Sequence, residues 1–338
     1  MKKKIAIGVY FAQDYIIHTA YDVFSNKFER VYRDIESPQD GQQNIRLAAE
    51  AIHRLYSKYD IVGIGLAVPT TIPVLDRTDK ENYGRIGFPI GPRQWHEINV
   101  VKSIKHELAT FGTVISESAH VAIISQVGAT AFGDYRIRFP EVYSNGFNHK
   151  IARTIGNVLY VVADYGIGGA LIHRGKLFHG SSVPNIGHSI VHLHEDEIPK
   201  RCSLHPKRPC LNAVASLDAI EKRWGMTPSE FVRCKDEKKV SLVASYIAQI
   251  LGNLLYFCSP DNVVIAGRVS TNPMFLPLLH ANLLNQLNIK AGDPQIENNA
   301  LVSRENFILR PVDINVGVKG ACLLAEAWFR QEINKVES

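Results

Sequence analysis

Cysteine is scarce in this chain, with five residues among 338. Because five is an odd number with no obvious disulfide framework, the composition favours a reducing, cytoplasmic setting. Long apolar runs are also missing. No stretch approaches the roughly 20 residues that a membrane-spanning helix needs, so we expect no membrane partner. The basic N-terminus is not a signal peptide, because its apolar run is short, is interrupted by Gln13 and Asp14, and lacks a small-residue cleavage site.

An excess of charge of one sign is absent too. Lys and Arg number 38 against 33 Asp and Glu, which gives a net charge of +5. A solvated surface of mixed charge accounts for this small excess, so we expect no nucleic-acid partner. What the chain does have is length and apolar content. With 46% hydrophobic residues it can bury a large core, and two domains are favoured over one.

Hydrophobic periodicity predicts a mixed α/β fold in which strands and helices alternate. Strands are expected at residues 5–11, 15–23, 28–33, 60–68, 113–116, 158–163, 262–266 and 307–311. Helices are expected at residues 42–58, 99–111, 119–128, 216–224, 228–233, 240–254, 273–287 and 317–330. The polar and aromatic segment 134–157 is expected to be an excursion between the two halves.

A short loop in the second half carries a metal-binding pattern. Cys202, His205 and Cys210 follow Gly187-His188 with the spacing C-x2-H-x4-C. Zinc suits two imidazoles and two thiolates, and four protein ligands leave no open position, so the predicted zinc is structural. Buried thiols without metal are the alternative, but residues 200–209 are polar and lack an apolar pattern that would fold them. The predicted ligands are His188, Cys202, His205 and Cys210, with His192 or His194 as substitutes.

The segment 160–224 has a wider resemblance. A buried strand runs into a Gly-rich turn at Gly166 and Gly168, and the cysteine-containing loop and Arg223-Trp224-Gly225 follow. This order resembles the ROK family (repressors, open reading frames and sugar kinases), and the loop is most similar to the fructokinase branch. The resemblance implies an actin-like (ribonuclease H-like) ATPase fold of two similar α/β domains with a cleft between them. It places the domains at 1–122 plus 317–338 and at 123–316, with the zinc loop at 188–210, and implies a homodimer or homotetramer.

The same resemblance implies which residues bind a sugar or sugar phosphate. They are Thr70, Ser118, Asn185, His188 and Asn212. In the family, three carboxylates and a histidine bind the sugar, and one of the carboxylates is the general base. Here the resemblance aligns Ser118, Asn185 and Asn212 with the carboxylates, so only the histidine, His188, is retained. A serine cannot act as the general base without an activating partner, so Glu117 is the candidate base, displaced by one residue.

The nucleotide-binding motifs also depart from the family pattern. The resemblance assigns Gly166, Gly168 and Gly267 to a vestigial nucleotide site. In the first hairpin, residues 8–12 offer two aromatic side chains, Tyr10 and Phe11, where phosphate would lie. In the Gly-rich turn, Asp164 is expected to repel the phosphates of ATP unless a metal intervenes.

These departures favour a non-catalytic ROK protein that senses a sugar, and whether the chain is an enzyme is left open. ROK repressors carry a DNA-binding segment before the first strand, whereas here that strand begins at Lys4, so no direct nucleic-acid binding is expected. The alternative is an ATP-dependent sugar kinase, fructokinase-like or hexosamine-directed, which would use Mg-ATP. A third possibility is an assembly subunit that binds neither nucleotide nor sugar.

Overall fold

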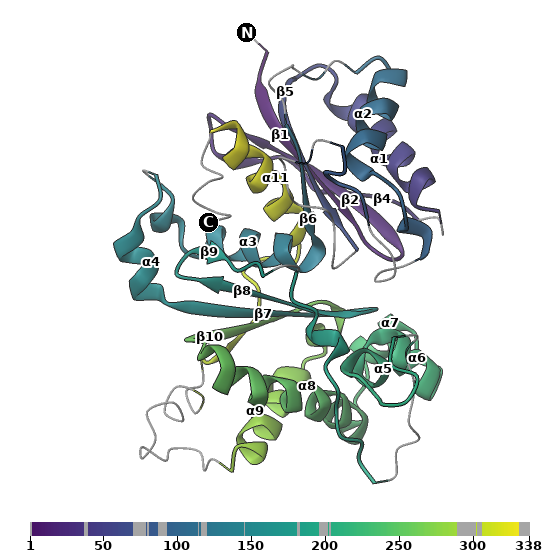
Figure 1. Ribbon diagram of the computed structural model, residues 1–338, viewed down its shortest axis with the longest axis vertical. Coiled ribbons are helices and arrows are strands. Elements are labelled where there is room, and N and C mark those ends of the chain that lie inside the picture. Colours follow the sequence, from purple (N-terminus) through teal and green to yellow (C-terminus); the bar gives the residue numbers. More distant parts are fainter. Residues whose placement is uncertain are drawn as a thin grey trace. The chain divides into compact units, whose positions relative to one another are not determined.

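The computed structural model describes residues 2–36, 40–69, 79, 81–86, 93–113, 115, 120–144, 146–180, 183–195, 202, 204–288, 302 and 306–330 (Figure 1). The chain divides into two compact units. Unit 1 comprises Met1–His149, Lys176–Val183 and Val312–Ser338, and unit 2 comprises Lys150–Gly175 and Pro184–Pro311. The boundary expected after residue 122 falls inside a strand of the unit 1 sheet, so unit 1 extends further along the chain than the sequence suggested.

Unit 1 contains a mixed sheet with the strand order β3-β2-β1-β5-β6, and β4 also pairs with β2. The strands are β1 (Lys4–Phe11), β2 (Tyr15–Asp22), β3 (Lys27–Phe28), β4 (Tyr32–Glu36), β5 (Asp60–Val68) and β6 (His120–Ser125). The predicted hairpin is confirmed, because β1 and β2 pair antiparallel. β5 lies between β1 and β6 and is buried along nearly its whole length, as its continuous apolar sequence predicts.

One local prediction in unit 1 was wrong. A strand was expected at 113–116 and a helix at 119–128, but Thr113 and Ile115 are not in a strand, and residues 114 and 116 lie outside the described residues. The strand is β6, and the helix begins only at Gln126. The reason is that the β-branched Val121, Ile123 and Ile124 complete a parallel ladder with β5, and this tertiary pairing decides the conformation.

The helices of unit 1 are α1 (Gly41–Tyr56), α2 (Val100–Thr110), α3 (Gln126–Arg138) and α11 (Val316–Phe329), with short 3₁₀ helices at Arg93–Trp95 and Pro140–Val142. α1 and α2 pack on this sheet through an apolar core, α11 packs on β1 and β5, and α3 packs on α11. The expected excursion at 134–157 thus contains the last turn of α3, the second of these 3₁₀ helices and α4 (His149–Ile155). α1 begins where the Asp40 carboxylate accepts from the backbone N–H groups of Gln42 and Gln43.

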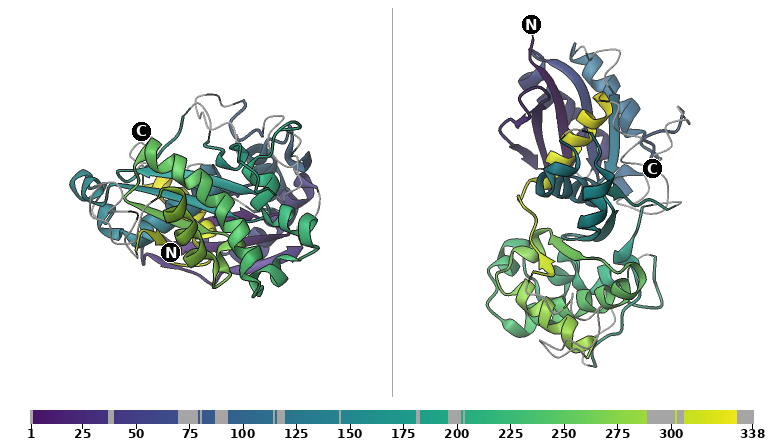
Figure 2. Two further views of the ribbon diagram at one scale, coloured as in Figure 1. Left: turned by 90° about the horizontal axis from the view of Figure 1, so that it is seen from below. Right: turned by 90° about the vertical axis from the view of Figure 1, so that its left-hand side faces the viewer.

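α11 approaches the sheet of unit 1 very closely (Figure 2). A Cβ atom on Gly65 of β5 would lie 1.9 Å from the backbone oxygen of Ala321, and one on Gly8 of β1 would lie 2.3 Å from that of Val318. Both neighbours are backbone atoms of a buried helix and cannot move independently. Glycine is therefore required at these positions so that the helix can pack on the strands.

Gly65→Ala is expected to lower the free energy of unfolding by about 3 kcal/mol, at the upper end of the cost of overpacking a core. The measurement is the urea unfolding midpoint followed by circular dichroism. Gly252→Ala is the matched control, since the nearest atom to its added Cβ is 3.7 Å away and the residue lies within helix α8 of unit 2. Equal midpoints for both variants would contradict the steric account.

Unit 2 is built on a second sheet in which β10 pairs parallel with β7 and β11, and β7 pairs antiparallel with β8. The strands are β7 (Asn157–Ala163), β8 (Ile167–His173), β10 (Asn262–Ala266) and β11 (Ile308–Leu309), and β9 (Lys176–Leu177) follows β8 along the chain. The helices are α5 (Leu211–Ala215), α6 (Leu217–Trp224), α7 (Pro228–Val232), α8 (Glu237–Cys258) and α9 (Phe275–Gln286), with short 3₁₀ helices at Ile186–His188 and Arg268–Thr271.

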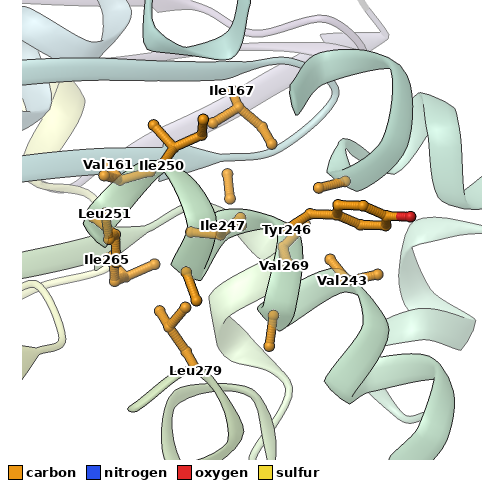
Figure 3. Packing of buried hydrophobic residues seen from close by; sticks show 14 of the residues in the cluster. Val161, Ile167, Val243, Tyr246, Ile247, Ile250, Leu251, Ile265, Val269 and Leu279 are labelled. Atoms are coloured by element: carbon orange, nitrogen blue, oxygen red, sulfur yellow. The ribbon is translucent and has the colours of Figure 1, made fainter. Parts of the chain in front are cut away.

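The core of unit 2 is formed by α8 against the sheet and α9. Figure 3 shows Ile247, Ile250 and Leu251 of α8 facing Val161 and Ile265 of the strands. Contrary to the expectation from sequence, α8 is long and apolar enough to cross a membrane by length and composition, but 56% of its apolar window is buried inside the protein. Burial in the core accounts for its apolar character.

Candidate metal and ligand site

The four predicted metal ligands come together in unit 2. His188 ends the short 3₁₀ helix after Asn185, and Cys210 directly precedes α5. The Sγ atom of Cys202 lies 3.4 Å from that of Cys210, 3.3 Å from His205 Nδ1 and 3.8 Å from His188 Nδ1. The distance from Cys210 Sγ to His188 Nδ1 is 3.9 Å, and all four ligand atoms lie within 4.8 Å of one another.

These separations fit a tetrahedral zinc ion. With Zn–S bonds of about 2.3 Å and Zn–N bonds of about 2.0–2.1 Å, the ligand atoms of a tetrahedron lie roughly 3.3–3.8 Å apart. The four separations given above, 3.3–3.9 Å, lie in or near this range, and the other pairs of ligand atoms lie within 4.8 Å. The donor set and its spacing therefore suit zinc, and four protein ligands leave no open position for a substrate.

Backbone hydrogen bonds close the loop on either side of the cluster. The N–H of Leu211 donates to Ser189 O at 2.9 Å, and the N–H of Val191 donates to Pro209 O at 3.2 Å. Within the loop, the N–H of His205 donates to Cys202 O at 3.1 Å. These hydrogen bonds fix the loop just before α5 and at the turn between Cys202 and His205, and a metal would cross-link these two places.

The two substitute ligands, His192 and His194, lie elsewhere. The Nε2 atom of His194 is 2.8 Å from Ser245 Oγ on α8. The backbone of His192 exchanges two hydrogen bonds with the Gln249 side chain, also on α8. Neither histidine belongs to the cluster found among the described residues, so the substitution is not needed.

Burial affects the protonation of two members of the cluster before a metal binds. It lowers the pKa of His188, with a further contribution from His205, and so favours the neutral imidazole that zinc requires. Burial also raises the pKa of Cys210 to about 11, with the neighbouring Cys202 acting in the same direction. The Cys210 thiol therefore keeps its proton at neutral pH until a metal displaces it.

The predicted sugar-binding residues fall into two groups. Asn185, His188 and Asn212 are described, and all three are partly buried in unit 2. The Nδ2 atom of Asn212 lies 3.5 Å from His188 Nε2, and Oδ1 accepts from the N–H of Ile167 at 2.6 Å. Asn212 thus links a predicted zinc ligand to the strand after the Gly-rich turn. Thr70, Glu117 and Ser118 lie outside the described residues.

The Gly-rich turn differs from the sequence expectation because Asp164 is neutralised. Its carboxylate accepts from Arg268 Nη2 at 2.6 Å, from Arg268 Nε at 3.0 Å and from the backbone N–H groups of Arg268 and Tyr165 at 3.0 and 2.9 Å. The Arg268 guanidinium also lies 4.7 Å from the centre of the Tyr165 ring. The repulsion of phosphate expected from Asp164 is therefore compensated within unit 2.

Gly267 places Arg268 beside this turn. Its φ is +88°, and an added Cβ would lie 2.2 Å from the backbone oxygen of Ala163, so only glycine fits between β10 and β7 here. Asp164 and Arg268 are 104 residues apart, and no local sequence signal pairs them.

The aromatic residues of the first hairpin belong to the packing of unit 1. Phe11 is fully buried, and its ring centre lies 5.1 Å from that of Trp95. The Tyr10 ring lies against Gly317 at the start of α11. The expectation that both rings occupy a phosphate position was wrong for Phe11, because its side chain is in the core.

Comparison with known proteins supports the resemblance. The ROK family profile matches residues 145–327. A "Putative fructokinase" of Bacillus subtilis (strain 168) is 23% identical over 287 residues, which cover 84% of this chain and 85% of that protein. The fructokinase of Zymomonas mobilis is 34% identical over 113 residues, covering 33% of this chain and 37% of its own length.

Solved structures show the same fold. A ROK family glucokinase from Streptomyces griseus, in complex with glucose and AMPPNP, superposes with a TM-score of 0.66 at 16% identity, covering 97% of this chain and 99% of its own. A ROK family transcriptional regulator, homologous to the E. coli MLC protein, has a TM-score of 0.67 at 11% identity, covering 98% of this chain and 80% of its own. The two α/β units are thus of the actin-like ATPase type.

Proposed function

Because the chain belongs to the ROK family, we propose that it binds a monosaccharide and transfers a phosphoryl group from ATP to one of its hydroxyl groups. Relatives that carry the name fructokinase support this activity. The observation that carries the proposal is the Asp164–Arg268 ion pair. Because the arginine compensates the charge of Asp164, the Gly-rich turn does not repel the phosphates of ATP. The kinase alternative considered from sequence therefore takes precedence over the non-catalytic one.

In this proposal each group has a defined role. The backbone at Gly166, Gly168 and Gly267 lies next to the phosphates of ATP, which enters with Mg²⁺. Glu117 accepts the proton of the attacking sugar hydroxyl, the oxygen forms a bond to the terminal phosphorus, and ADP leaves. The sugar is held by Thr70, Ser118, Asn185, His188 and Asn212.

We assign His188, Cys202, His205 and Cys210 to a structural zinc ion. The ion would cross-link the loop, and it takes no part in phosphoryl transfer because its coordination is complete. We also propose that the protein is cytoplasmic and forms a homodimer or homotetramer.

A non-catalytic sugar sensor is the second candidate. One observation favours it: Asn212 stands where the resemblance places a sugar-binding carboxylate, and its Oδ1 is already hydrogen-bonded to the N–H of Ile167. A protein of this kind would bind sugar without needing nucleotide, and any regulatory role would act through a protein partner.

Calorimetric titration with Mg-ATP tests the nucleotide part of the proposal. Wild-type protein is expected to bind, and Arg268→Ala is expected to bind at least about tenfold more weakly, because Asp164 is left as an uncompensated charge beside the phosphates. The double variant Asp164→Asn with Arg268→Gln is the matched control. It restores neutrality at the turn and is expected to bind within a few-fold of wild type.

Two outcomes would count against this account. Absence of heat with millimolar Mg-ATP would remove the kinase proposal and leave the sensor. Unchanged affinity in the Arg268→Ala variant would show that the ion pair does not govern nucleotide binding.

A further inference from the structure

Two sulfur atoms of the metal cluster are in contact with each other. The Sγ atoms of Cys202 and Cys210 lie 3.4 Å apart, and the structure describes all five cysteines of the chain. The thiols of Cys258 and Cys322 instead donate to backbone oxygens, at 3.2 and 3.4 Å. Cys202 and Cys210 are therefore placed to react with each other.

The two sulfur atoms differ in how easily a solute reaches them. Cys202 is partly exposed, whereas Cys210 is fully buried and directly precedes α5. A small oxidant therefore meets Cys202 first, with the Cys210 sulfur next to it. An exposed thiolate with a second cysteine beside it, which can resolve the oxidised product, is typical of redox-sensitive sites.

Zinc ligation would hold both sulfur atoms as thiolates, the form that reacts with oxidants. Because zinc has no redox chemistry of its own, the electrons for such a reaction can come only from sulfur. Cys258 is a contrasting case. Burial raises its pKa, and its thiol donates to Leu254 O, so it stays protonated at neutral pH and reacts slowly.

We propose that Cys202 and Cys210 form an oxidative modification site, which a hydroperoxide converts to a disulfide with release of the zinc ion. The Cys202 thiolate attacks one peroxide oxygen, the O–O bond breaks, and Cys202 becomes a sulfenic acid as hydroxide leaves. The Cys210 thiolate then attacks the Cys202 sulfur, and the S–O bond breaks to release a second hydroxide. Each hydroxide takes up a proton. Two thiolates, two protons and one hydrogen peroxide thus give one disulfide and two waters.

The loop can form this disulfide through a small movement. An S–S bond is about 2.05 Å long, so the two sulfur atoms must approach each other by about 1.4 Å. The described residues between the two cysteines form no helix or strand, and the hydrogen bond from the His205 N–H to Cys202 O closes a single turn. After oxidation only His188 and His205 remain as ligands, which are too few to retain zinc.

This inference rests on the zinc assignment proposed above and is independent of phosphoryl transfer. In a reducing cytoplasm, thiol reductants would restore the two thiolates, so the modification is reversible. Oxidation would remove the metal cross-link between the loop and the start of α5. The thermal unfolding temperature is therefore expected to fall on oxidation and to recover when a thiol and zinc are added back.

Hydrogen peroxide added to the zinc-loaded protein tests the inference. A chelating dye follows zinc, which is expected to leave at least about tenfold faster than without peroxide. Mass spectrometry after blocking of free thiols locates the disulfide. Lys207 lies between the two cysteines, so after trypsin digestion only a disulfide holds the two peptides together. One zinc ion is expected per disulfide formed, and dithiothreitol with added zinc is expected to reverse both changes.

Cys234→Ser and Cys258→Ser are the matched controls, because each removes a partly exposed cysteine and keeps the pair. Both are expected to release zinc at the wild-type rate. Zinc retention at peroxide concentrations that oxidise Cys234 would overturn the inference. Zinc release with Cys202 converted to a sulfinic acid, and with no link to Cys210, would overturn it as well.

The outcomes separate this inference from the earlier proposals. A protein that binds no zinc overturns the zinc assignment and this inference together, whereas a zinc-loaded protein that resists peroxide overturns this inference alone. Phosphorylation of a sugar by the reduced protein bears only on the kinase proposal.

Discussion

Replacing Glu117 by Gln is expected to lower the rate constant of sugar phosphorylation by about 10²–10⁴-fold, the usual contribution of a general base. Glutamine keeps the size of the side chain but cannot accept the proton of the attacking hydroxyl. Sugar affinity is expected to change only a few-fold, because the loss falls on the transition state. Steady-state kinetics with varied sugar and saturating Mg-ATP separate kcat from KM.

Two controls make the Glu117 result specific. Glu221→Gln removes a carboxylate from an exposed position of α6 and should leave the rate unchanged. Ser118→Ala tests the residue that the resemblance aligns with the family's base. A wild-type rate in Glu117→Gln, or an equal loss in Ser118→Ala with none in Glu117→Gln, would contradict the assignment of the base.

Substituting Cys202 or Cys210 by Ser is expected to release the zinc ion. Removal of one thiolate leaves three ligands and is expected to weaken zinc binding on the order of 10³-fold. The loop has few apolar residues to replace the metal, so the thermal unfolding temperature should fall as well. Elemental analysis of the purified protein measures the zinc content, expected to be close to one ion per chain in the wild type.

Cys234→Ser is the matched control for the zinc prediction, because Cys234 is partly buried in unit 2 but lies outside the cluster. His194→Ala tests the substitute ligand and should retain zinc, since its ring contacts Ser245. Full zinc content in the Cys202 and Cys210 variants would show that the cluster is not a metal site.

The elements with strong local patterns could be predicted from sequence. β5 is a continuous apolar run, and α1 has its apolar residues on one face, so each is determined by its own residues. The grouping of the candidate metal ligands could also be predicted, because Cys202, His205 and Cys210 lie within nine residues of the chain and their spacing carries the signal.

The interactions that change the interpretation of the site could not be predicted. The Asp164–Arg268 pair joins residues 104 positions apart, and the hydrogen bond from Ile167 to Asn212 spans 45. The first forms because β7 and β10 pair in one sheet, and the second forms because α5 packs beside β8. β6 was assigned to a helix for a similar reason, since its conformation depends on pairing with β5.

The most direct test of the kinase proposal is mass spectrometry of monosaccharides incubated with zinc-loaded protein and Mg-ATP. Fructose, glucose and N-acetylated hexosamines form the panel. The account predicts that one of them gains a single phosphoryl group, with an equal amount of ADP formed. Sugar binding without any phosphorylated product would contradict it and identify the chain as a sensor.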